Sequence, residues 1–146
     1  MNYIIRLMTR EDAPQVIDMM RVFYTSPAVF TNGSEEIFQT DVENCVNDKP
    51  YLEGYVFEAE KEILGYGMVA KSFSTEFGKP CMWIEDLYLK EECRGLGIGS
   101  TFLNFITEKY PEAIFRLEVE AENERAVKSY RKCGFVELPY MEMKRG

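Results

Sequence analysis

Arg94-Gly95-Leu96-Gly97-Ile98-Gly99 is the stretch from which the fold of this chain can be deduced. It follows a strand-like segment, residues 82–89, and precedes a helix-like segment, residues 100–109. Glycine loses more conformational freedom on folding than other residues, so three alternate glycines are expected only where side chains would obstruct. Between a strand and a helix they expose backbone N–H groups at a helix N-terminus, where anions bind. The stretch therefore predicts a site for a phosphate-bearing ligand, with Arg94 as a charge partner.

Two common phosphate-binding loops do not match this spacing. The P-loop, Gly-x-x-x-x-Gly-Lys-Ser/Thr, requires a lysine where this chain has Ser100 after Gly99. The dinucleotide-binding loop has the spacing Gly-x-Gly-x-x-Gly, which is longer than the spacing found here. A third interpretation is a flexible glycine turn that merely precedes an ordinary helix.

The composition predicts one globular domain spanning residues 1–146, because a chain of 146 residues with 46% hydrophobic residues can bury a core. No apolar run approaches the roughly 20 residues that a membrane helix needs, and residues 1–6 are too short and mixed for a signal peptide. We therefore expect a cytoplasmic protein without a membrane partner. The net charge of −8 argues against nucleic acid as a partner. It fits a cationic small-molecule substrate, and it also fits simple solubility.

Cysteine and histidine usage restricts the possible chemistry. The chain has four cysteines and no histidine, and none of the cysteines forms a Cys-x-x-Cys pair. A metal site is therefore not expected, and neither are disulfides in a cytoplasmic chain. Without histidine, Ser-His and Cys-His nucleophile systems are excluded. Proton transfer must use Glu, Asp, Tyr, Cys, Lys or water.

The hydrophobic pattern predicts the order β-α-α-β-β-β-α-β-α-β-β. Thr9 and Ser34 are expected to cap the first two helices, and Pro111 and Gly134 to follow the last two. The expected strands are residues 3–7, 51–60, 63–72, 81–89, 113–119, 135–137 and 140–144. Strands on either side of the third helix should be parallel, and the earlier hairpins antiparallel. This predicts an α/β (α+β) fold with a mixed, mainly antiparallel sheet, helices on both faces and a parallel central pair flanking the glycine-led helix.

Taken together, these features resemble the GNAT superfamily of acetyl-CoA-dependent N-acetyltransferases. The glycine run is similar to the family's Arg/Gln-x-x-Gly-x-Gly/Ala signature. Upstream, Ile84-Glu85-Asp86-Leu87-Tyr88-Leu89 resembles the family's fourth strand. Downstream, residues 123–130 and Cys133-Gly134-Phe135 resemble its Asn-x(6)-Tyr helix and the following Gly-Phe. The resemblance covers nearly the whole chain and implies acetyl-CoA as cosubstrate, with no metal.

The resemblance also implies where coenzyme A binds, namely in the gap between the two parallel strands. Its extended pantetheine arm can pair with a strand edge as an added strand would. Its pyrophosphate is expected on the N–H groups of the glycine run, and Asn123 is expected to bind near the pantetheine. The implied cofactor-binding residues are Leu87, Tyr88, Leu89, Arg94, Gly95, Leu96, Gly97, Ile98, Gly99, Ser100, Asn123 and Tyr130.

The implied reaction is direct attack of an amine on the acetyl thioester. An alkyl amine with a pKa near ~10.4 is neutral in only about one molecule in two thousand at pH 7, so a base is needed. Glu85 and Asp86 are the candidates, either directly or through water, and Glu85 is favoured because family members that acetylate polyamines carry such a Glu-Asp pair. On a regular strand the two side chains would point to opposite faces. Tyr130, with a reference pKa near ~10, is the candidate acid for the departing thiolate; its alternative role is core packing.

Three functions follow from the resemblance. The first is acetylation of a small cationic, polyamine-like amine. The second is acetylation of a protein or peptide N-terminus or lysine, and the third is a non-catalytic coenzyme-A-binding domain. The acceptor pocket is expected from the first two helices and residues 23–33, with Tyr24, Phe30 and Phe38 as candidates. Dimers in the family suggest a homodimer.

Overall fold

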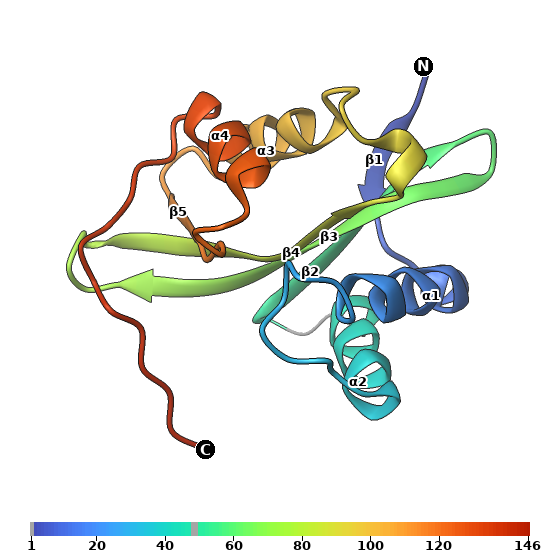
Figure 1. Cartoon of the computed structure of the whole chain (residues 1–146), viewed down its shortest axis with the longest axis horizontal. Coiled ribbons are helices and arrows are strands. Elements are labelled where there is room, and N and C mark those ends of the chain that lie inside the picture. The colour runs from blue at the N-terminus through green and yellow to red at the C-terminus, as the bar shows by residue number, and fades with distance from the viewer. Residues whose placement is uncertain (1, 48–49) are drawn as a thin grey trace.

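The computed structural model describes residues 2–47 and 50–146 and contains one mixed sheet with helices on both faces (Figure 1). The strands lie in the order β1-β2-β3-β4-β5, and all neighbours are antiparallel except the parallel pair β4–β5. This confirms the expected fold class and the parallel pair, but the pair lies at one edge of the sheet and not at its centre, because no strand forms after β5 in the described chain. The elements are β1 (Ile4–Leu7), α1 (Ala13–Phe23), α2 (Glu35–Val46), β2 (Leu52–Ala59), β3 (Glu62–Ser74), β4 (Lys79–Leu89), α3 (Ile98–Lys109), β5 (Ile114–Leu117) and α4 (Glu124–Lys132).

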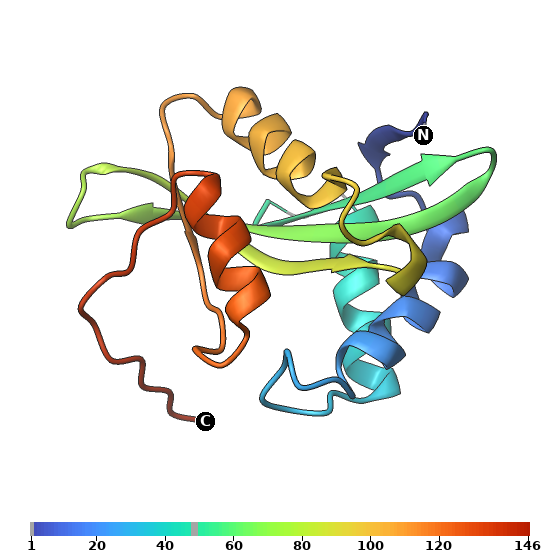
Figure 2. The same ribbon diagram turned by 45° about the horizontal axis from the view of Figure 1, so that its top comes forward.

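The core has two parts, one on each face of the sheet. Figures 1 and 2 show α1 and α2 on one face, and α3 and α4 on the other. Alternation along β2 follows this division, because Val56 faces α1 and α2 while Tyr55 and Phe57 face α3. Phe102 of α3 packs against both of these rings, with centroid distances of 5.7 and 5.2 Å. The sheet is thus held rigidly between two apolar layers.

Local polar contacts fix the helix starts that the sequence predicted. The Ser34 hydroxyl accepts the Ile37 N–H at 3.2 Å and caps α2. Before α1, the Thr9 N–H donates to Asp12 at 2.7 Å, across a 3₁₀ turn at Arg10–Asp12. Asp12 is buried and also accepts two hydrogen bonds from Arg6 of β1, at 2.8 and 2.9 Å. The start of α1 is therefore anchored to the edge of the sheet.

The end of the chain differs from the sequence expectation. Residues 135–137 and 140–144 were expected to form strands, but the structure has neither helix nor strand after α4. Pro139 lies between the two segments and cannot donate to a strand ladder, and Gly134 turns the chain away in the left-handed region, at φ +94°. Figure 1 shows the segment running past the end of the sheet as an extended trace. The alternating pattern of residues 135–137 and 140–144 therefore predicted two strands that the structure does not form.

Other helix and strand boundaries differ from the sequence expectation by a few residues. The connection between the expected strands 63–72 and 81–89 is a short turn, because β3 and β4 continue further along the hairpin. The expected strand 113–119 narrows to β5, and α3 begins at Ile98 inside the glycine run. No helix in the described part of the chain is long and apolar enough to cross a membrane.

Candidate active site

The glycine run forms a loop that leads into α3, in which the Arg94 N–H donates to the Glu91 carbonyl at 3.2 Å. Gly95 and Gly97 adopt φ values of +77° and +83°, a region that favours glycine. Within residues 2–47 and 50–146, no backbone acceptor is found for the N–H groups of residues 95–100. The first to bond back is Thr101, to the Gly97 carbonyl at 3.0 Å. The buried Ile98 side chain anchors the loop. The loop therefore has the geometry of an anion site at a helix N-terminus.

Arg94 lies at the loop but folds back onto β4. Its Nε donates to the Leu89 carbonyl at 3.0 Å, and its guanidinium lies over the Tyr88 ring, 5.5 Å from the centroid. This contact uses one of the five N–H donors of the guanidinium. Arg94 thus ties the loop to the end of β4.

A second cation lies beside the loop, and the sequence analysis missed it. A Cβ built on Gly95 would be 3.2 Å from Nη2 of Arg125, in the first turn of α4. Nothing in the linear sequence marks Arg125, because 30 residues separate it from Gly95 and other cations occur on the same helix. Only the packing of α4 beside the loop brings the two together.

The edge of β4 is open where the sequence placed the pantetheine arm. β4 pairs with β5 only from Cys81 to Ile84. Beyond that point Leu87, Tyr88 and Leu89 pair with β3 alone. Within the described chain they have no strand partner on the other side, so their outward backbone groups can accept an added extended chain.

A β-bulge at Glu85 reverses the alternation of side chains along β4. Met68 of β3 pairs with Asp86 and Val69 pairs with Ile84, so Glu85 is the extra residue. Met82 and Ile84 therefore face α3, whereas Asp86 faces α1 and α2. The regular strand assumed from the sequence is wrong here. A signal was present in the apolar spacing, which changes from two residues to three between Ile84 and Leu87.

Asp86 is 4% exposed and accepts hydrogen bonds on both carboxylate oxygens. The Tyr24 hydroxyl donates to Oδ1 at 2.8 Å, and the Tyr66 hydroxyl donates to Oδ2 at 2.8 Å. Burial raises the pKa of Asp86, and the two hydroxyl donors oppose that rise. Asp86 is therefore a fully engaged buried acid.

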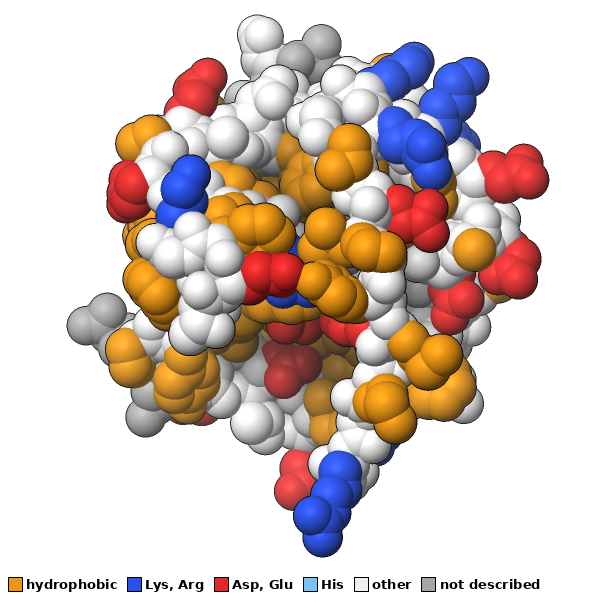
Figure 3. Space-filling model, turned by 90° about the vertical axis from the view of Figure 1, so that its left-hand side faces the viewer, with side chains coloured by type: hydrophobic (Ala, Val, Ile, Leu, Met, Phe, Trp, Pro, Cys, Tyr) orange, Lys and Arg blue, Asp and Glu red, His pale blue; other side chains and the backbone are white. Residues whose placement is uncertain are grey.

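Glu85 is more accessible and lies among other carboxylates. Partial burial raises its pKa, and the charges of Asp86 and Glu142 raise it further. On α2, burial and the charges of Asp86 and Glu85 raise the pKa of Asp41 to about 6. At the end of β5, a hydrogen bond with Glu142 of the C-terminal segment raises the pKa of Glu118 to about 7, together with partial burial. Figure 3 shows acidic side chains at the bottom of a hollow on this side of the molecule.

This arrangement can bind a cation and accept a proton. Among the residues that the structure describes, none of these five carboxylates forms an ion pair with Lys or Arg. Carboxylates that raise one another's pKa are stabilised by a cation between them, and a carboxylate with a raised pKa is a stronger base. This group of carboxylates therefore suits a positively charged amine.

Helix α4 carries the remaining predicted residues. Asn123 caps the helix, and its side-chain oxygen accepts the Ala126 N–H at 3.3 Å, which leaves the amide NH₂ for other partners. Tyr130 packs into the core on the α3 side, next to Phe135 at 6.0 Å between centroids. Burial raises its pKa, so the hydroxyl keeps its proton at neutral pH. Tyr130 and Asp86 thus reach opposite faces of the sheet.

The three aromatic residues expected at an acceptor pocket lie in different surroundings. Phe38 is buried in the core with α1, and Phe30 is 86% exposed in the loop between α1 and α2. Only Tyr24 reaches the carboxylates.

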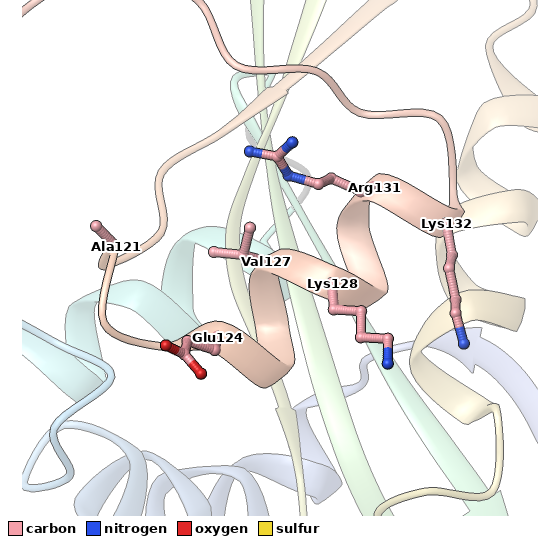
Figure 4. Close-up of a pocket in the computed structure, with 6 residues that line it drawn as sticks. All are labelled: Ala121, Glu124, Val127, Lys128, Arg131 and Lys132. Atoms are coloured by element: carbon pink, nitrogen blue, oxygen red, sulfur yellow. The ribbon is translucent and has the colours of Figure 1, made fainter.

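A shallow cavity of about 520 Å³ lies on the outer side of α4 (Figure 4). Figure 4 shows Lys128 and Lys132 pointing to one side of the helix, while Val127 and Arg131 point to the other. The cavity contains none of the predicted catalytic residues. Its lining residues are Ala121, Glu124, Val127, Lys128, Arg131 and Lys132.

Comparison with known proteins gives consistent results. The model of the Acetyltransferase (GNAT) family matches residues 15–135. Thialysine N-epsilon-acetyltransferase of Bos taurus is 35% identical over 83 residues, which cover 55% of this chain and 48% of the relative. The protein of the same name from Sus scrofa matches to the same extent. The chain thus spans about half the length of these curated relatives.

Solved structures share the fold along the whole chain. A possible acetyltransferase from Clostridium difficile 630 has a TM-score of 0.83 at 19% identity, covering 99% of this chain and 97% of its own. Ribosomal-protein-alanine N-acetyltransferase from Brucella melitensis biovar Abortus 2308 has a TM-score of 0.75 at 13% identity, covering 99% and 100%. At these identities the likeness shows the fold and says nothing about the acceptor.

Proposed function

This chain belongs to the Acetyltransferase (GNAT) family, and we propose that it is an N-acetyltransferase with acetyl-CoA as donor, whose acceptor is the primary amine of a small, polyamine-like cation. The observation that carries this proposal is the set of carboxylates around Glu85, which form no ion pair with any Lys or Arg that the structure describes. They lie on α2, on β4, directly after β5 and in the C-terminal segment, and the charge of Glu85 raises the pKa of both Asp41 and Glu118. The net charge of −8 adds an attractive field for cations.

The similarity to thialysine N-epsilon-acetyltransferase supports the proposal, because that name describes transfer to an amine on a small molecule. Protein or peptide N-termini and lysines are the alternative acceptors. The concentration of negative charge favours the small cation.

The residues present fit coenzyme A. The N–H groups of residues 95–100 can hold its pyrophosphate, and the open edge at Leu87, Tyr88 and Leu89 can pair with its pantetheine arm. We assign Arg125 as an additional phosphate partner, because it borders Gly95. The amide NH₂ of Asn123 stays available for the pantetheine.

When bound, acetyl-CoA supplies an activated acetyl thioester. We assign Glu85 as the base that takes a proton from the acceptor ammonium through its carboxylate, directly or through water. Asp86 is less suited, because both of its oxygens are engaged in the protein interior. We assign Tyr130 as the acid that gives its hydroxyl proton to the departing sulfur.

Thiol release from acetyl-CoA across a panel of amines tests this function. The panel contains linear diamines and polyamines, lysine analogues, aminoglycosides and peptides with free N-termini. We expect the highest kcat/KM for the polyamines. A higher value for peptides would identify a peptide acetyltransferase, and acetyl-CoA binding without thiol release for any amine would identify a non-catalytic domain.

A further inference from the structure

Asp86, Tyr24 and Tyr66 form a buried unit beside the bulge. Each tyrosine hydroxyl donates to a different oxygen of the carboxylate, at 2.8 Å in both cases. Tyr66 is fully buried on β3, and Tyr24 follows the last turn of α1. The carboxylate is therefore held from two elements at once, in one orientation. We call these three residues the tyrosine clamp.

The clamp is itself held by aromatic packing. The Tyr24 ring lies 5.3 Å from Phe23 and 5.4 Å from Phe38, between centroids. Phe23 contacts Tyr88 of β4 at 5.7 Å, and Tyr66 contacts the same ring at 6.1 Å. These contacts leave the two hydroxyls little freedom to move away from Asp86.

The clamp lies next to the extra residue of the bulge. Glu85 has no register partner on β3, so the strand ladder does not fix its orientation. Bulges re-aim side chains next to active sites. The first residue after the bulge is Asp86, and its side chain is the one that the tyrosines hold. The direction of Glu85 therefore depends on how firmly Asp86 is held.

We propose that Tyr24 and Tyr66 are positioning residues of the acetyl transfer, which hold Asp86 so that the bulge presents Glu85 to the acceptor amine. This inference rests on the proposed role of Glu85 as base. It assigns the tyrosines no contact with the substrate.

The clamp also has an electrostatic consequence. The groups that face Glu85 are Asp86 on β4, Asp41 on α2, Glu118 after β5, Glu142 in the C-terminal segment and the Tyr24 hydroxyl. Hydroxyl donors favour the ionised form of Asp86, and its negative charge raises the pKa of Glu85. Loss of a donor lets Asp86 hold a proton more readily, so the pKa of Glu85 falls. The acidic limb of the pH–rate profile then moves to lower pH.

The test compares Tyr24→Phe, Tyr66→Phe and the control Tyr110→Phe in kcat, in the pH profile of kcat/KM for a polyamine and in acetyl-CoA affinity. The Tyr110 hydroxyl donates to Glu53, so the control removes a similar tyrosine–carboxylate bond away from the bulge. We expect Tyr24→Phe to lower kcat about tenfold. We also expect its acidic limb to move down by roughly half to one pH unit, with unchanged acetyl-CoA affinity. Tyr24 is the decisive variant, because Tyr66 lies in the core and its loss can unfold the protein.

Two results overturn the inference. One is a Tyr24→Phe enzyme with the kcat and acidic limb of the wild type. The other is an equal change in Tyr110→Phe, which would reflect general loss of stability. A Glu85→Gln variant separates this failure from failure of the proposed function. If Glu85→Gln is slow while Tyr24→Phe is normal, only the clamp is wrong; if Glu85→Gln keeps the full rate and pH profile, the base assignment is wrong.

Discussion

At the scale of single residues, the surroundings of Glu85 give the carboxylate its chemical character. It lies at the bulge, is more accessible than Asp86, and has negative neighbours that raise its pKa. A raised pKa makes a carboxylate a more effective proton acceptor near neutral pH, while its accessibility lets an ammonium approach. Asp86 is the next residue in the sequence, yet its buried environment gives it a structural role.

Replacing Glu85 with Gln tests the base directly. Activity of the wild type should be lost as the pH falls through the raised pKa of Glu85, because the protonated carboxyl cannot accept a proton. We expect Glu85→Gln to lower kcat/KM about 10²-fold or more at pH 7 and to lose this acidic limb. The rate should recover partly at high pH, where more acceptor amine is already neutral. Initial-rate measurements from pH 5 to pH 10 check this; an unchanged profile would contradict it.

Replacing Tyr130 with Phe tests the acid. Burial keeps the hydroxyl protonated, and Phe preserves the ring packing against Phe135. We expect kcat to fall by about 10² and the acetyl-CoA dissociation constant to stay within about twofold. Tyr140→Phe is the matched control, because Tyr140 is exposed and bonds to Glu76 in the hairpin turn. An undiminished rate in Tyr130→Phe would leave the residue with a packing role only.

At the scale of elements, the loop between β4 and α3 determines donor binding. Its N–H groups are available because Gly95 and Gly97 adopt backbone conformations that other residues adopt at a cost of about 1–2 kcal/mol. The open edge of β4 begins where its pairing with β5 ends. The expected position of the pantetheine arm therefore lies on the same stretch of chain that leads into the phosphate-binding loop.

Gly97→Ala should weaken acetyl-CoA binding by about tenfold, because the substitution strains the loop and puts a methyl group where the pyrophosphate approaches. Gly78→Ala is the matched control, because Gly78 also has a positive φ, +65°, and equally open space for a Cβ, but it lies in the β3–β4 turn. Isothermal titration of both variants distinguishes the effects. Equal acetyl-CoA affinity in the two would show that the glycine loop does not bind the cofactor.

The anchor between β1 and α1 gives a prediction on stability. Burial would raise the pKa of Asp12, but the hydrogen bonds from Arg6 and Thr9 lower it overall. A carboxyl group whose pKa is lower in the folded state than in the unfolded state stabilises the protein fully above the unfolded-state pKa. This stabilisation is lost as the pH falls through the folded-state pKa. We expect Asp12→Asn to reduce the free energy of unfolding by about 1–3 kcal/mol at pH 7, with the difference shrinking below about pH 4.

Urea denaturation at pH 7 and pH 3 measures this difference. Glu43→Gln removes the exposed ion pair with Arg10 and should cost under about 1 kcal/mol. The prediction is wrong if Asp12→Asn reduces the free energy of unfolding by an equally small amount, or by as much at pH 3 as at pH 7.

At the scale of the whole molecule, the sequence predicted the features that local patterns encode. The glycine spacing, the helix caps and the period of the apolar residues specified the order of elements and the parallel pair. The bulge was missed because a regular two-residue strand period was assumed for Glu85 and Asp86, although the apolar spacing changes between Ile84 and Leu87. The pairing of Tyr24 with Asp86, 62 residues apart, depends on how α1 packs on the sheet. Arg125 likewise acquires its position only through packing.

The C-terminal segment shows the opposite error, because local patterns predicted strands there that do not form. Its alternating residues have the local preference of a strand, but a strand forms only where a neighbour pairs with it. Pro139 interrupts the run, and the structure leaves Met141 and Met143 largely exposed. Local propensity was therefore outweighed by missing long-range partners.

The central claim is that the enzyme transfers acetyl groups from acetyl-CoA to a small cationic amine. The most direct measurement is a competition, in which a linear polyamine and a peptide with a free N-terminus are present at equal concentration with limiting acetyl-CoA. Mass spectrometry then quantifies the two acetylated products. We expect acetylated polyamine to dominate in the wild type and neither product to form at a comparable rate in Glu85→Gln. Predominant acetylation of the peptide would contradict it.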